Sequence, residues 1–317
     1  MALIWSLSSS FPLGPRGVVM ALGFGLGLAL FLALVVIEWG AWTLVRPGRR
    51  LAGPPPEPGP WEPIACRAAD GTSLHGAWRR CDEARGRTAI LLHGFAEDRS
   101  ALLGRAEALA PFGWNVALFD IRGRGHSHGE HTAFGGFEAD DLRAWLDVLA
   151  ERVGPELVPV AWGRSMGAAI ALRAAADDPR LAALVLEAPY ADLRTAVAGW
   201  LARLRLPGRL AGLILLRARR LAGVSLARPR PIDLAPRVRV PVLILHGTAD
   251  PIVPSHEARR LAAAFPNRAE IIEVPGAGHT SVFDLGGPEL AVRIAAFLDD
   301  AVAPRIESNR DRSQGGC

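Results

Sequence analysis

A serine, an aspartate and a histidine in the second half of the chain have the residue types and the order of a nucleophilic triad. Ser165 lies in a Gly-x-Ser-x-Gly sequence between an apolar run and an alanine-rich helical pattern. Asp250 follows the apolar run 242–246, and His279 follows the run 270–274. A serine hydroxyl becomes a good nucleophile when an imidazole takes its proton and a carboxylate orients that imidazole. The three residues could therefore attack an ester or thioester carbonyl.

The residues around Ser165 indicate how its side chain is presented. Glycines stand two positions before it and two positions after it. A sharp turn from strand to helix leaves no room for side chains at those positions, so glycine fits there. The pattern predicts a nucleophile elbow, with an ordinary turn as the alternative. Arg164, beside the serine, could pair with an acid beneath the elbow or face an anionic group of the substrate.

Two upstream segments complete a resemblance to a known family. Residues 89–95 read as a strand followed by a His-Gly turn, and residues 120–127 read Asp-Ile-Arg-Gly-Arg-Gly-His-Ser. With residues 163–167, residues 246–250 and the order Ser, Asp, His, the chain resembles the α/β-hydrolase superfamily over residues 62–301. It is similar to the membrane-anchored esterase-like branch, which is grouped with monoacylglycerol lipases and serine aminopeptidases.

The resemblance implies a role for each candidate residue. Ser165 would be the nucleophile, with Asp250 and His279 as its partners. The backbone N–H groups of Phe95 and Met166 would form the oxyanion hole. The resemblance implies neither a cofactor nor a metal ion.

The chain departs from the family pattern at two places. Ala168 stands where many members have a further glycine, which changes the packing under the helix but not the chemistry. Residues 93–95 lack the glycine-rich extension of proline iminopeptidases and many hormone-sensitive-lipase-like esterases. This second departure weakens the interpretation as a peptidase.

The pattern of apolar runs predicts an α/β fold with strands and helices in alternation. An initial hairpin followed by alternating units indicates a mostly parallel eight-stranded sheet with helices on both faces, as in the α/β-hydrolase fold. Strands are predicted at 62–68, 73–79, 88–93, 115–120, 158–162, 183–187, 241–246 and 270–274. Helices are predicted at 100–110, 138–152, 166–176, 255–265 and 288–301, and a small helical lid at about 191–236. All three triad candidates follow strands, at the edge where such sheets bind ligands.

The N-terminal segment indicates membrane attachment. Residues 17–37 contain no charged side chain, and 21 residues cross about 30 Å of hydrocarbon as a helix. We therefore expect a transmembrane anchor at 17–45, with Trp39 and Trp42 at the interface. A cleaved signal peptide and a buried core helix are the alternatives. A tail at 1–16, a Pro/Gly-rich linker at 46–61, the hydrolase domain at 62–301 and a disordered tail at 302–317 complete the expected organisation.

The distribution of arginines bears on orientation and partners. Arg46, Arg49 and Arg50 follow the span, whereas Arg16 precedes it, so the positive-inside rule favours a cytoplasmic catalytic domain. Residues 191–240 hold eleven arginines against two aspartates. Nucleic-acid binding would interleave such charge with aromatics, and Trp200 alone is aromatic there. The basic lid either contacts anionic lipid or carries solvated arginines while its leucines line an acyl pocket.

Other reactive side chains have simpler interpretations. The histidines at 126, 128 and 131 with Glu130 could suggest zinc, but His126 belongs to the 120–127 turn that the family already has. His93 and His246 precede glycines at strand ends, where local hydrogen bonds are more common than catalysis. Cys66 and Cys81 should lie too far apart to form a disulfide.

These observations predict a single-pass, membrane-anchored serine hydrolase that acts on carboxylic esters or thioesters. Its substrate would be a small-molecule ester or a lipid-like ester, and no nucleic acid would be involved. An aminopeptidase and a protein depalmitoylase are the nearest enzymatic alternatives. A catalytically silent binding protein on the same fold is the alternative from another class.

Overall fold

The computed structural model describes residues 15–46, 48, 59–267 and 269–314. Eight strands form one sheet in the order β1-β2-β4-β3-β5-β6-β7-β8. β1 and β2 form an antiparallel hairpin, β2 pairs antiparallel with β4, and every other neighbouring pair is parallel. The predicted eight-stranded, mostly parallel α/β-hydrolase sheet is confirmed. The strands are β1 Trp61–Arg67, β2 Ser73–Arg79, β3 Arg87–Leu92, β4 Asn115–Phe119, β5 Val158–Arg164, β6 Leu184–Glu187, β7 Val242–Gly247 and β8 Glu270–Val274.

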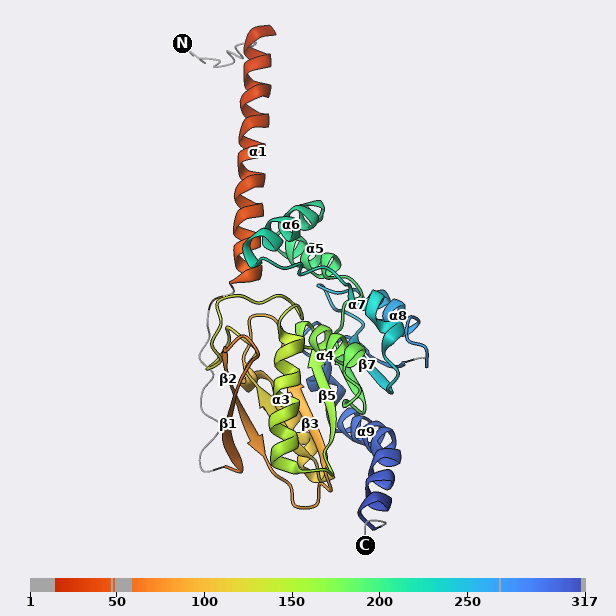
Figure 1. Cartoon of the computed structure of the whole chain (residues 1–317). Helices are drawn as coiled ribbons and strands as arrows, with labels where there is room; N and C mark the ends of the chain where they lie inside the picture. Colours follow the sequence, from red (N-terminus) through yellow and green to blue (C-terminus); the bar gives the residue numbers. More distant parts are fainter. Residues whose placement is uncertain (1–14, 47, 49–58, 268, 315–317) are drawn as a thin grey trace, which may run out of the picture.

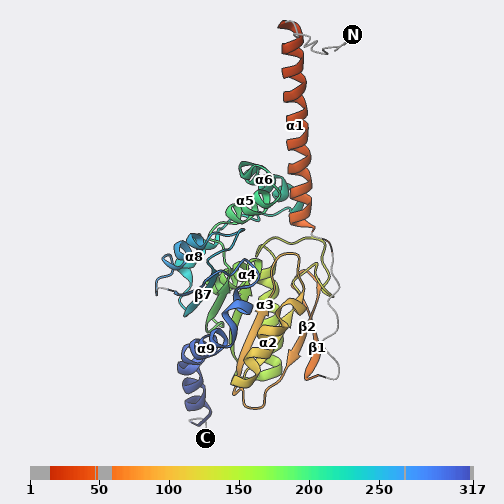
Figure 2. The ribbon, with the colours of Figure 1, turned by 180° about the vertical axis from the view of Figure 1, so that it is seen from behind.

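Helices cover both faces of this sheet (Figures 1 and 2). On one face α3 and α4 pack together over a large apolar core, which α8 extends. On the other face α2 and α9 pack over a second core. The helices are α2 Leu103–Leu109, α3 Glu138–Val153, α4 Met166–Asp177, α8 Ser255–Ala262 and α9 Val282–Gln314, with 3₁₀ turns at Arg99–Leu102 and Ala110–Phe112. All seven residues of β5 are buried, as expected for a central strand covered on both faces.

The chain between β6 and β7 leaves the sheet and forms short helices, in the region predicted to be a lid. α5 spans Leu193–Arg203, α6 spans Ala211–Ala222 and α7 spans Pro231–Leu234. Short 3₁₀ turns at Gly208–Leu210 and Ala235–Arg237 connect them. α5 and α6 pack against each other above the carboxyl ends of the strands (Figure 1).

A long apolar helix, α1 at Pro15–Val45, projects from the domain beside α6 (Figures 1 and 2). It is long and apolar enough to cross a membrane, and its most hydrophobic 18-residue window has a mean hydropathy of 2.6. None of that window is buried in the structure. The exposure excludes the buried core helix that was the alternative for this segment. A signal sequence passes the same test of length and composition.

The predicted disordered tail at 302–317 is wrong as far as the structure describes it. α9 continues through residue 302 to Gln314, with a non-helical kink at Gly287. Val302 is fully buried, and the Arg305 guanidinium donates to the carbonyl oxygens of Pro179, Arg180 and Leu181 at 3.0, 2.6 and 2.9 Å. Most residues from 302 onward are polar, but the apolar residues at 298, 302 and 306 are spaced four apart and share one face of a helix. Residues 315–317 lie outside the described residues, as do 1–14 of the predicted N-terminal tail, and 47 and 49–58 of the predicted linker.

Candidate active site

Ser165 lies at the turn between β5 and α4 in a strained backbone conformation. Its φ and ψ angles are 52° and −108°. A Cβ atom on Gly163 would lie 2.2 Å from the carbonyl oxygen of Gly167, and a Cβ on Gly167 would lie 2.1 Å from the oxygen of Leu92. Both contacts are far too short, so these positions require glycine. The Ser165 N–H donates to the Glu187 carbonyl at 2.8 Å, which ties the elbow to the end of β6.

The structure brings Ser165, His279 and Asp250 together from three strand ends. The Ser165 Oγ lies 2.9 Å from Nε2 of His279. Nδ1 of the same ring lies 2.6 Å from Oδ2 of Asp250. A carboxylate only accepts hydrogen bonds, so Nδ1 carries the proton and Nε2 is left to accept the serine proton. The arrangement is the one that proton transfer from the hydroxyl requires.

The second oxygen of Asp250 is held by the backbone. Its Oδ1 accepts hydrogen bonds from the N–H groups of Ile252 at 2.8 Å and Val253 at 2.9 Å. Burial alone would raise the pKa of this carboxyl, but the hydrogen bonds from His279, Val253 and Ile252 outweigh it and lower the pKa below its ordinary value. Asp250 is therefore ionised at neutral pH, which is the state that orients an imidazole.

Phe95 and Met166 lie just beyond the carboxyl ends of the neighbouring strands β3 and β5. Met166 is the first residue of α4, so its N–H has no partner within the helix, and the helix dipole favours negative charge there. Phe95 follows β3, whose Leu92 pairs with Gly163 of β5. The Phe95 ring stacks on Phe134 at a centroid distance of 5.3 Å. Both backbone groups thus lie at the edge of the sheet that carries Ser165.

An ion pair next to the elbow joins Arg164 to Glu97, a partner that the sequence analysis does not identify. Arg164 is buried, and its guanidinium contacts the carboxylate of Glu97. Glu97 Oε2 also accepts a hydrogen bond from the Gly94 N–H at 2.8 Å, one residue before Phe95. Of the two roles considered for Arg164, the structure therefore shows pairing with an acid. The signal that could have identified Glu97 is an acidic residue three positions after a glycine in the turn that follows β3.

The remaining histidines contact the backbone or other side chains. His93 Nε2 accepts from the Ile121 N–H at 3.0 Å, and burial lowers its pKa. His246 Nε2 donates to the Val253 carbonyl at 2.8 Å, and burial lowers its pKa as well. His131 Nε2 accepts from Arg46 at 2.9 Å. Within the described part of the chain, no group of three or more His, Cys, Asp or Glu side chains is arranged to hold a metal ion. The described cysteines, Cys66 and Cys81, are free thiols.

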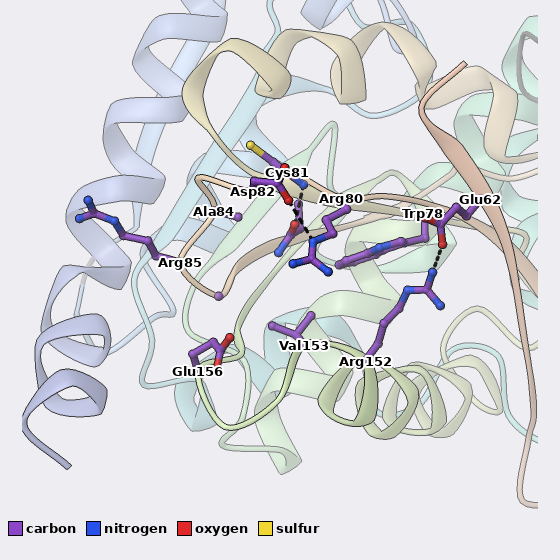
Figure 3. A pocket seen from close by; sticks show the side chains of 12 residues that line it. Glu62, Trp78, Arg80, Cys81, Asp82, Ala84, Arg85, Arg152, Val153 and Glu156 are labelled. Atoms are coloured by element: carbon purple, nitrogen blue, oxygen red, sulfur yellow. Dashed lines mark hydrogen bonds and ion pairs between the residues drawn. The ribbon is translucent and has the colours of Figure 1, made fainter. Parts of the chain in front are cut away.

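A cavity of about 280 Å³ lies at the opposite edge of the sheet. Figure 3 shows Arg152 reaching Glu62 and Arg80 reaching Asp82 around it. Arg79, one residue before Arg80, pairs with Val116 near the start of β4. Because ligands of such sheets bind at the carboxyl ends of the strands, this cavity does not belong to the site around Ser165.

The chain is similar to known proteins over most of its length. A family model described as serine aminopeptidase, S33 matches residues 83–229, and one described as TAP-like protein matches residues 222–311. Uncharacterized protein Rv2307c of Mycobacterium tuberculosis is 32% identical over 243 residues, which are 75% of this chain and 79% of that protein.

Two solved esterases share the fold. The esterase Pf2001 of Pyrococcus furiosus superposes with a TM-score of 0.69 at 23% identity, over 81% of this chain and 98% of its own. A thermophilic esterase of Thermogutta terrifontis gives a TM-score of 0.55 at 25% identity, over 76% and 99%. The likeness extends over the hydrolase domain and nearly the whole length of each esterase.

Proposed function

The chain belongs to the α/β-hydrolase superfamily, and from this premise we propose that it is a membrane-anchored serine hydrolase of carboxylic esters or thioesters. The observation that carries the proposal is the hydrogen-bonded series from Ser165 through His279 to Asp250 at the carboxyl edge of the sheet. A silent binding protein on this fold would not need a strained serine aligned with an imidazole and an ionised carboxylate.

In the proposed reaction the Ser165 Oγ attacks the carbonyl carbon while its proton moves to Nε2 of His279. Asp250 stabilises the imidazolium, and the N–H groups of Phe95 and Met166 bind the developing oxyanion. Nε2 then gives its proton to the leaving alcohol or thiol as the bond to the carbonyl carbon breaks. Water, deprotonated by Nε2, hydrolyses the acyl-serine, and the proton returns to Ser165.

The Glu97–Arg164 pair would position the oxyanion hole. Glu97 holds the Gly94 N–H, so it fixes the backbone immediately before Phe95. Arg164, the residue before the nucleophile, contacts Glu97 and so joins this turn to the elbow. The two halves of the proposed oxyanion hole would thereby be tied to each other through this ion pair.

The same ion pair argues against the aminopeptidase alternative. An aminopeptidase needs a free carboxylate near the nucleophile to bind the ammonium group of its substrate. Glu97 is an acid next to the elbow, and it is already paired with Arg164. We therefore propose an ester or thioester as the substrate, with α1 as the membrane anchor and the hydrolase domain on the cytoplasmic side.

The experiment is a comparison of p-nitrophenyl butyrate with alanine p-nitroanilide as substrates of the full-length protein in detergent. We expect hydrolysis of the ester alone, and its loss in Ser165→Ala. Cleavage of the anilide at a rate equal to or above that of the ester would favour the aminopeptidase. Ester hydrolysis that persists at the wild-type rate in Ser165→Ala would refute the proposed nucleophile.

A further inference from the structure

α1 divides into an exposed part and a packed part. Residues 17–35 are all exposed or half-exposed, and as a helix these 19 residues span about 28 Å, close to the roughly 30 Å thickness of the hydrocarbon core. From Val36 onward the helix packs against the domain, and Ala41, Leu44 and Val45 are buried. The hydrocarbon region therefore ends where the protein packing begins.

α6 is the lid helix that packs on this lower part of α1. The Arg217 guanidinium donates to both carboxylate oxygens of Glu38, at 2.6 and 2.8 Å. Gly40 faces Ile214 so closely that a Cβ would lie 3.0 Å from its Cδ1 atom. Trp42 Nε1 donates to Glu38 Oε1 at 2.9 Å, so an interfacial aromatic side chain joins the same cluster.

The outward face of α6 is apolar and basic. Leu213 and Leu216 are 50% and 49% exposed, whereas the neighbouring Ile214 and Leu215 are buried. Arg219 and Arg220 are exposed on the following turn. On the adjoining end of α5, Trp200 and Leu204 are also exposed apolar side chains. Figures 1 and 2 show α5 and α6 together at the base of the exposed part of α1.

We propose that this face of α6, with the end of α5, is seated in the lipid headgroup region of the leaflet where α1 ends. Its partner is the phospholipid bilayer, because the face is continuous with the membrane span and its arginines complement anionic headgroups. The buried Ile214 and Leu215 already supply the inward apolar contacts of α6. Leu213 and Leu216 are thus free to contact acyl chains.

The lid and the lower end of α1 both rest on the elements that carry the candidate active site. The Val45 carbonyl accepts a hydrogen bond from the Thr132 N–H at 3.0 Å, and the Thr132 hydroxyl lies 3.5 Å from Sδ of Met166. On the other side, a Cβ on Gly199 of α5 would lie 2.0 Å from the oxygen of Ile252, two residues after Asp250. This step rests on the proposed function, and it specifies the substrate class as an amphiphilic ester that reaches Ser165 from the adjacent leaflet.

The depth of α6 can be measured without any assay of activity. The full-length protein, with its three cysteines replaced by serine, receives a single cysteine at Leu213 or Leu216. A nitroxide label is attached, and the protein is reconstituted into nanodiscs that contain anionic lipid. Val292 on α9 is the matched control, because it is 53% exposed and lies on the helix that runs away from α1.

We expect the labels at 213 and 216 to collide more often with oxygen than with a water-soluble nickel complex, and the label at 292 to show the reverse. Collision ratios at 213 and 216 equal to that at 292 would overturn the proposed membrane contact. This outcome does not depend on the proposed function.

The substrate class is tested with the double substitution Leu213→Asp and Leu216→Asp. In nanodiscs we expect about a tenfold slower hydrolysis of p-nitrophenyl palmitate and an unchanged rate with p-nitrophenyl butyrate, since charged side chains are expelled from the acyl region. Equal rates of the variant and the wild type on both esters would overturn access from the leaflet. Failure of the wild type to hydrolyse butyrate would instead refute the proposed function.

Discussion

The guanidinium of buried Arg164 pairs with the carboxylate of partly exposed Glu97 next to the elbow. Glu97 also holds the backbone of the turn that leads to Phe95. Glu97 is thus placed to fix the distance between the proposed nucleophile and the backbone N–H of Phe95, the proposed oxyanion-hole donor. Substitution of Glu97 should therefore change kcat and KM to different extents, which steady-state kinetics can measure.

Glu97→Ala should lower kcat for p-nitrophenyl butyrate by about tenfold to a hundredfold with little change in KM, because a displaced oxyanion donor acts only in the transition state. Glu97→Gln keeps an acceptor for the Gly94 N–H and should recover part of kcat. Steady-state kinetics and thermal unfolding of both variants separate positioning from loss of fold. A KM that rises while kcat stays constant would contradict the positioning role.

Ser165→Ala and His279→Ala should each lower ester hydrolysis by several orders of magnitude. The double variant should lose little more, because residues that act as a unit are not additive. Initial rates at saturating substrate measure the effect. Losses that multiply in the double variant would show that the two side chains act independently.

Asp250→Asn should destabilise the protein in a pH-dependent way. The pKa of Asp250 is lowered in the folded state, so its carboxylate stabilises the fold above its unfolded pKa of about 4. That stabilisation disappears as pH falls through the folded pKa. The difference in Tm between the wild type and Asp250→Asn should therefore be largest at neutral pH and smallest at pH 3. A gap that is constant from pH 7 to pH 3 would contradict the ionised, hydrogen-bonded Asp250.

The proposed orientation in the membrane can be tested at Cys317, which lies outside the described residues. If Arg46, Arg49 and Arg50 hold the domain in the cytoplasm, a membrane-impermeant maleimide should label this thiol only after lysis. Labelling of intact spheroplasts that is lost in Cys317→Ser would place the hydrolase domain outside.

The sequence was sufficient to predict the strands, because buried parallel strands are continuous apolar runs and turns between them carry glycine. The predicted start of β2 at 73 and of α3 at 138 coincide with the observed ones. The elbow was predictable because a side chain at Gly163 or Gly167 would collide with the backbone. Both positions therefore require glycine, and the Gly-x-Ser-x-Gly sequence reveals this requirement.

Contacts between distant segments were not predictable from local patterns. Glu38 and Arg217 are 179 residues apart, and no periodicity in the sequence links α1 to α6. The sequence indicates an acidic partner for Arg164, but it does not identify Glu97, because this acid lies in an irregular turn. The polar composition of residues 302–317 does not predict the extension of α9, which depends on the four-residue spacing of the buried Leu298 and Val302.

The most direct test of the central claim is covalent labelling of the full-length protein with a fluorophosphonate probe, followed by mapping of the modified peptide. A serine activated by His279 should react through Oγ and place the label on Ser165. Ser165→Ala should remain unlabelled, and His279→Ala should label far more slowly. An unlabelled wild-type protein, or a label on another serine that persists in Ser165→Ala, would contradict the assignment of Ser165 as an activated nucleophile.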